Sequence, residues 1–151
     1  MPVHLLKTVQ RELVPELAPL GFAIVAHTGS RWTSETVELQ CLDLRIRISF
    51  ERGWFEVHFG IAQDPFTWFS CYEVLERMGY ASAALSGTDA GETIQRLKSF
   101  VRAEIVTLLS LFSVGSYEAT RIELMEVRRE MNNNLMAQRP APWDGRKKHR
   151  R

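Results

Sequence analysis

The stretch TVELQCLDLRIRISFERGWFEVHF, residues 36–59, decides the fold class of this chain. Its apolar residues fall on alternate positions and change phase in the first half: Val37, Leu39 and Cys41 come first, then Leu42, Leu44, Ile46 and Ile48. Successive side chains of a strand point to opposite faces, so a change of phase predicts a turn between two strands. We place a two-residue turn at Cys41-Leu42, which pairs Leu39 with Leu44. On the other face this turn pairs Glu38 with Arg45, two opposite charges.

The second half of the stretch contains another change of phase, at Glu51-Arg52-Gly53. Glycine adopts the positive φ that a tight hairpin turn needs, so we place the second turn at Arg52-Gly53. This turn pairs Phe50 with Phe55 and sets Arg47 opposite His58. With a further strand at 22–27, the sequence predicts a meander of four antiparallel strands that has one apolar and one polar face. The polar face collects Glu38, Arg45, Arg47, Ser49, Glu56 and His58, with Trp54 beside the turn.

Helix signals flank the predicted strands on both sides. Leucine and valine residues spaced three and four apart predict an N-terminal helix over 3–20, with a bend at Pro15. Capping signals begin a short helix at Ser70 and a long one at Asp89, each with a glutamate three residues later. Asp64-Pro65 is a rival start for the short helix. A more charged helix is expected over 117–131. The sequence therefore predicts the α+β class: an N-terminal helix, a four-stranded antiparallel meander, and C-terminal helices packed on one face.

Length and charge describe one domain with a basic end. The chain has 151 residues, of which 45% are hydrophobic and 25% charged, as in an ordinary globular domain. Residues 138–151 hold six basic side chains and one acidic, a net charge of +5, which leaves −4 for the remainder. We expect a single α+β domain over 1–137 and a basic, disordered tail over 138–151 with too few apolar residues to dock.

Several classes of protein are not expected from this composition. The two cysteines and four histidines show no metal-ligand spacing, so we expect neither a metal nor another cofactor. No apolar run approaches the ~18 residues of a membrane helix, and the first residues show no secretory apolar run. We expect a cytoplasmic protein that has no membrane partner.

Four features together resemble a known group of proteins. They are the leading helix that ends at Gly21-Phe22, the hairpin at Glu51-Arg52-Gly53, a Trp-containing helix start after it, and the run LLSLFS at 108–113. They resemble a loose group of small, uncharacterised bacterial α+β proteins with a charged-Arg-Gly hairpin, more often Asp-Arg-Gly. Some similar small proteins serve as immunity proteins of toxin systems. The resemblance covers 5–131; it implies the fold and supplies no catalytic residues.

The hairpin tip and the polar face hold the candidate binding residues. Tryptophan and arginine are enriched at interface hot spots, which favours the tip. The candidate partner-binding residues are Arg47, Arg52, Trp54, Glu56, His58 and Trp32. Both tryptophans have the alternative of leaning on the edge of the core. A Glu-His-Arg group could do acid–base chemistry, because histidine titrates near neutral pH. No nucleophile, metal cluster or phosphate loop completes this group, so we do not expect an enzyme.

The sequence favours a non-enzymatic protein-binding module, of the immunity or antitoxin type, that neutralises or scaffolds a partner protein. An acidic body suits a basic partner such as a nuclease toxin. The alternative is a nucleic-acid-associated protein that acts through the tail, because clustered lysine and arginine attract phosphate backbones. Its candidate contact residues are Arg146, Lys147, Lys148, Arg150 and Arg151.

Overall fold

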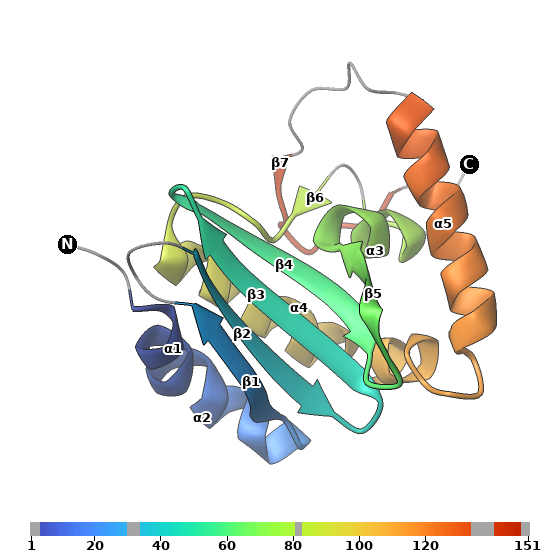
Figure 1. The fold of residues 1–151 in the computed structure, drawn as a ribbon. Helices are drawn as coiled ribbons and strands as arrows, with labels where there is room; N and C mark the ends of the chain where they lie inside the picture. The colour runs from blue at the N-terminus through green and yellow to red at the C-terminus, as the bar shows by residue number, and fades with distance from the viewer. Residues whose placement is uncertain (1–3, 30–33, 81–82, 134–140, 149–151) are drawn as a thin grey trace.

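A five-stranded antiparallel sheet organises the molecule (Figure 1). The structure is a computed structural model and describes residues 4–29, 34–80, 83–133 and 141–148. The strands are β1 (Ala23–Gly29), β2 (Ser34–Cys41), β3 (Leu44–Glu51), β4 (Trp54–Ile61) and β5 (Asp64–Ser70). They lie in the order β1-β2-β3-β4-β5, and each is antiparallel to its neighbours. The α+β class is confirmed, with one strand more than the four predicted.

The additional strand, β5, escaped prediction because its pattern is weak. Its pairing with β4 shifts register between Phe59 and Ile61, so the alternation of apolar residues does not carry over from β4. Pro65 lies near its start, a residue that sheets accept at an edge because it donates no ladder hydrogen bond. The rival helix start at Asp64-Pro65 is wrong, because Asp64–Ser70 form a strand.

The two hairpins within 36–59 differ in how well their turns were predicted. The turn at Arg52-Gly53 is confirmed, and Phe50 lies opposite Phe55. The turn predicted at Cys41-Leu42 is wrong: Cys41 pairs with Leu44, so the turn residues are Leu42 and Asp43. Leu42 is apolar yet 75% exposed, at a positive φ of 53°.

The shift of one turn position also changes the cross-strand partners. Leu39 lies opposite Ile46 rather than Leu44, and Glu38 lies opposite Arg47. Glu38 still meets Arg45, since a diagonal contact brings Nη1 of Arg45 within 3.7 Å of its carboxylate. The predicted ion pair therefore forms, although its register was wrong.

The N-terminal helical segment breaks into short pieces around Pro15. They are α1 (Leu5–Thr8), the π-helical η1 (Val9–Leu13), α2 (Val14–Leu17) and the 3-10 helix η2 (Ala18–Leu20). Proline offers no amide hydrogen and crowds the preceding turn, which accounts for the wide turn ahead of it. Four of its residues, three and four apart, have no exposed surface: Leu5, Val9, Leu13 and Leu17.

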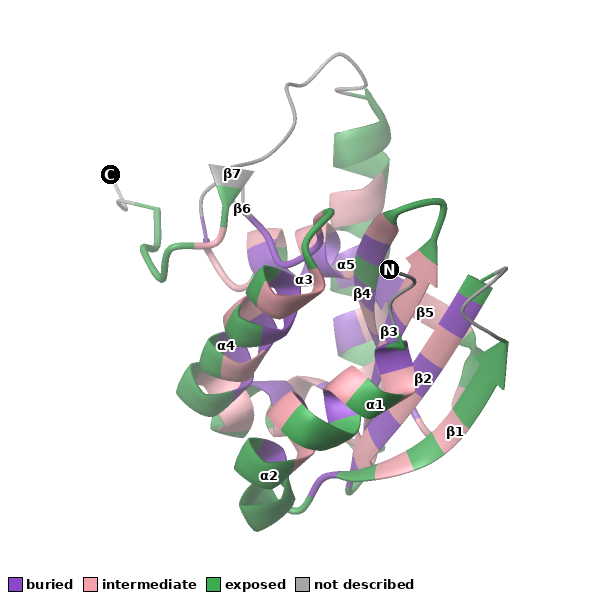
Figure 2. Cartoon of the chain, turned by 90° about the vertical axis from the view of Figure 1, so that its left-hand side faces the viewer, coloured by how far each residue is buried: buried purple, intermediate pink, exposed green. Residues whose placement is uncertain are grey.

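The C-terminal helices are α3 (Cys71–Arg77), α4 (Ala90–Leu111) and α5 (Tyr117–Asn133). The capping box at Ser70 is confirmed, and Asp89 caps α4 by accepting from the amide of Glu92. Figure 2 shows α4, α1 and α2 on one side of the strands, with the buried residues between them. This inner face of the sheet holds the core. Among the described helices none is long and apolar enough to cross a membrane.

The segment expected as a tail is partly packed on the body. Its residues Ala141–Pro142 form β7, which runs parallel to β6 (Ala83–Ala84). The ring of Trp143 makes edge contacts with those of Tyr80 and Phe100, with centroids 5.7 Å apart in both cases. The expectation that this segment has too few apolar residues to dock overlooked one large aromatic side chain.

Candidate binding site

The outer face of the sheet is left open by the described helices. In Figure 1 the sheet lies in front of α4, and α5 stands beside β5 rather than across the strands. Side chains at alternate positions of β2, β3 and β4 therefore point outward, and most are polar. This is the surface on which the sequence placed its candidate binding residues.

A hollow of about 350 Å³ lies on this face at the tip of the β3–β4 hairpin. It is lined by Ser49, Glu51, Arg52, Trp54 and Glu56. Arg52 is exposed at the turn, and Trp54 is half-buried beside it. The structure thus brings together three of the six predicted binding residues around one hollow.

Next to this hollow, Arg47 lies over an aromatic ring. Its guanidinium carbon is 4.5 Å from the ring centroid of Trp68 on β5, a cation–π contact. Trp68 can lie there because Gly60 has no side chain: a Cβ at this position would stand 3.1 Å from the indole ring. The Arg47 Nε atom is buried and has no hydrogen-bond partner among the residues described. Burial lowers the pKa of Arg47, and the negative charges of Glu38 and Glu56 act in the opposite direction.

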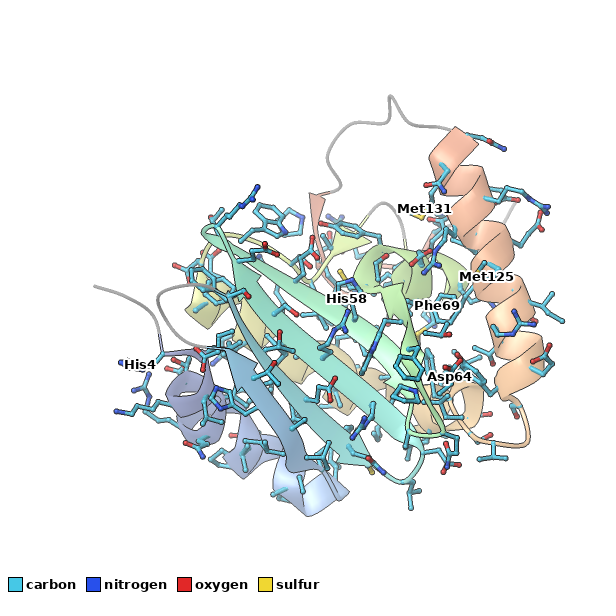
Figure 3. The ribbon with its side chains drawn as sticks, in the orientation of Figure 1. His4, His58, Asp64, Phe69, Met125 and Met131 are labelled. Carbon is cyan, nitrogen blue, oxygen red and sulfur yellow. The ribbon has the colours of Figure 1, made fainter. Side chains whose placement is uncertain are left out.

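His58 lies opposite Arg47, as predicted. Figure 3 shows His58 on the face of the sheet that is turned toward the viewer. The pKa of His58 is lowered to about 4, mainly by burial and also by the positive charges of Arg47 and Arg128. The negative charge of Glu73 acts in the opposite direction. The imidazole is therefore neutral at pH 7. Its Nε2 is 3.9 Å from a carboxylate oxygen of Glu56, and its buried Nδ1 finds no hydrogen-bond partner in the described part of the chain.

A partly buried ion pair ties α5 to this edge of the sheet. Arg128 on α5 donates to both carboxylate oxygens of Glu73 on α3, at 2.5 and 3.1 Å, and to the backbone oxygen of Trp68 at 2.9 Å. Glu73 raises the pKa of Arg128. We did not predict this bridge, because its partners are 55 residues apart in the sequence. The only local signal in the sequence was the capping box, which places Glu73 in the first turn of α3.

The remaining predicted residues do not join this site. Trp32, Arg150 and Arg151 lie outside the described residues. The three described basic residues of the tail each meet a carboxylate of the chain. These ion pairs are Arg146 with Asp144 at 2.8 Å, Lys147 with Glu104 at 3.5 Å, and Lys148 with Glu76.

The hydroxyl and thiol groups in and next to this face are engaged or buried. The hydroxyl of Ser49 accepts from Thr36, and that of Ser70 caps α3. The thiol of Cys71 is fully buried, and burial raises its pKa, which disfavours the reactive thiolate. No three acidic, histidine or cysteine side chains of the described ranges gather so as to hold a metal ion.

Comparison of the chain with protein-family models, with curated proteins and with solved structures gives no match. The resemblance to small immunity-like proteins therefore stays a prediction. The function is therefore inferred from the geometry of the outer face alone.

Proposed function

We propose that this chain is a non-enzymatic binding protein that recognises a partner protein through the outer face of its sheet and the tip of the β3–β4 hairpin. The observation that supports it is the hollow at the tip, formed by Arg52, Trp54 and Glu56 on a face that the described helices leave open. A rigid two-residue hairpin presents these side chains at little cost in conformational entropy.

Charge indicates the chemistry of the partner. The hollow holds two carboxylates, Glu51 and Glu56, against one guanidinium, Arg52. The chain up to residue 137 carries a net charge of −4. Both features favour a partner that presents lysine or arginine. Within this class we propose the immunity or antitoxin type of role, in which a basic protein such as a nuclease toxin is neutralised.

Binding of nucleic acid through the tail is the less favoured alternative. Arg146, Lys147 and Lys148 are each compensated by a carboxylate of the chain, so their charge is not freely offered to phosphates. A gel shift with DNA or RNA at low salt tests it, since contacts to phosphate weaken steeply as salt rises. A salt-sensitive shift that is lost on truncation after residue 140 would favour the alternative.

Site-directed photo-crosslinking tests the proposed interface directly. A photoreactive amino acid is placed at Arg52, at the hollow, and in a second sample at Arg102, an exposed residue of α4. Each protein is irradiated in lysate of the native host, and the adducts are identified by mass spectrometry. We expect a basic protein captured from position 52 and not from position 102.

A titration of variants against the captured protein then measures the contribution of the tip. Arg52→Ala and Trp54→Ala should each weaken binding by about 2 kcal/mol or more, as hot spots do. Arg102→Ala should leave the affinity unchanged within about 0.5 kcal/mol. Circular dichroism checks that each variant is folded. Equal affinity for the wild type and both tip variants would show that the hairpin tip is not the interface.

A further inference from the structure

A second pocket lies beside Trp54. It has a volume of about 390 Å³, between the start of β4, α3 and the first turns of α4. Its walls include Trp54, Tyr72, Ser86, Thr88, Glu92 and Arg96. Pockets that hold small organic molecules have volumes of about 300–1,000 Å³ and combine aromatic walls with a few polar groups. None of the residues predicted from the sequence, apart from Trp54, belongs to this pocket.

Arg96 is the main polar group of the pocket. Its side chain is only 18% exposed, yet its buried Nε has no hydrogen-bond partner within the described residues. The Nη2 atom stands 3.8 Å from a carboxylate oxygen of Glu92, too far for a hydrogen bond. Glu92 itself is 70% exposed and belongs to the rim. A buried guanidinium nitrogen without an acceptor is costly, and Glu92 is too distant to supply one, which favours an acceptor supplied by a ligand.

The local backbone makes room for this guanidinium. A Cβ at Gly87 would stand 3.1 Å from Nη2 of Arg96, so a larger residue there would displace the side chain. Gly87 is held in place by two hydrogen bonds with the backbone of Phe55, at 2.7 and 3.0 Å. The fully buried hydroxyl of Thr93, one turn of α4 before Arg96, also lacks a hydrogen-bond partner among the described residues.

The charges and the aromatic walls together define the class of ligand. Arg96 fits a carboxylate, and Glu92 on the rim fits an ammonium group. Trp54 and Tyr72 offer apolar ring surface to a third group. We propose that this pocket binds a small aromatic zwitterion of the free amino-acid type, with its carboxylate on Arg96, its ammonium near Glu92 and its ring against the aromatic walls.

Three commercially available probes separate these contacts. L-Phenylalanine carries all three groups, 3-phenylpropanoate lacks the ammonium group, and phenethylamine lacks the carboxylate. Each is titrated into the ¹⁵N-labelled full chain, and the Nε–H signal of Arg96 and the amide signal of Thr88 are followed by NMR. We expect both signals to move and saturate with L-phenylalanine. Each of the other probes should bind about tenfold more weakly or worse, because it forfeits a hydrogen bond to a charged group.

Two variants and a control make the result decisive. Glu92→Gln is on the exposed rim and should keep the fold; it should weaken L-phenylalanine and leave 3-phenylpropanoate unaffected. Arg96→Gln should abolish binding of both acids, whereas Arg102→Gln, on the same helix outside the pocket, should change nothing. The absence of a saturable shift, or equal affinities for the three probes, would overturn the proposal. Because Arg96 does not line the hollow at the hairpin tip, these outcomes are independent of the proposed protein interface.

Discussion

Replacing Glu35 by alanine should be one of the most damaging single changes at a charged residue of this protein. Glu35 is 4% exposed and lies on the inward-facing side of β2, where its neighbours at alternate positions are apolar. Its carboxylate accepts from the amides of Leu5 and Leu6 at 2.8 and 3.1 Å. It also accepts from Nε2 of His27 at 2.7 Å. The side chain thus caps the first helix from a strand 30 residues away.

The magnitude follows from these three hydrogen bonds. Loss of a helix cap costs about 0.5–2 kcal/mol. A hydrogen bond to a charged group contributes about 1.5–3 kcal/mol, and such values are not additive within one network. We therefore expect Glu35→Ala to lower the free energy of unfolding by about 3 kcal/mol, a large share of the ~5–15 kcal/mol of a typical domain. Glu35→Gln keeps the volume and one acceptor, and should cost less.

Urea denaturation at constant pH measures this difference. Glu16→Ala is the matched control, because Glu16 makes an exposed ion pair with Arg102 at 3.2 Å. Such pairs contribute less than about 1 kcal/mol, so this variant should unfold close to the wild type. If Glu35→Ala and Glu16→Ala had the same midpoint, the carboxylate would not be holding the helix, and the reasoning would fail.

Three further predictions concern the sheet, the histidine and the C-terminal segment. Ile46→Ala, at a fully buried position, should cost about 2–5 kcal/mol in urea denaturation, and Arg45→Ala on the outer face less than about 1. The pKa of His58 is lowered from 6.5 to about 4, so the unfolded chain takes up this proton first as the pH falls. Stability should therefore drop by about 3 kcal/mol from pH 7 to pH 4, and His58→Gln should remove that part of the pH dependence. Trp143→Ala removes two edge contacts between rings, each worth about 0.5–1.5 kcal/mol, and should lower the melting temperature in a thermal scan; an unchanged value would mean that this segment does not stabilise the body.

The sequence predicts the fold where local chemistry and periodicity agree. The turn at Arg52-Gly53 carries a glycine at a positive φ between two apolar runs, so its register followed from position alone. At the other hairpin, Leu42 takes the positive φ although it is neither glycine nor asparagine. Its hydrophobicity extended the apparent apolar run by one residue and moved the predicted turn. The alternation of apolar residues and the usual turn residues gave different positions for this turn, and the prediction followed the alternation.

In the candidate site, the contacts within the predicted hairpin could be predicted, and those that depend on other elements could not. Arg47 and His58 could be placed opposite one another because both belong to the correctly predicted hairpin. Trp68, on which Arg47 lies, belongs to the strand that was not predicted, and Gly60 makes room for it only through that strand. Glu35 lies at an alternate position with the buried apolar residues of β2, so its place in the sequence pattern indicates that it is buried. Its binding partners, in contrast, depend on the tertiary packing.

Trp54 lines both the hollow at the hairpin tip and the pocket near α4, and this determines which variants can test the two proposals separately. The Trp54→Ala variant loses a wall of the hollow and a wall of the pocket. Weaker binding of either ligand to this variant therefore does not show which of the two cavities binds that ligand. Of these two cavities, Arg52 lines the hollow on the outer face but not the pocket, and Arg96 lines the pocket near α4 but not the hollow. If the two sites are independent, Arg52→Ala should weaken the protein partner and spare the zwitterion, and Arg96→Gln should do the reverse. An effect of both arginine variants on both ligands, in proteins that circular dichroism shows to be folded, would instead indicate coupling between the hollow and the pocket, which share Trp54 as a wall.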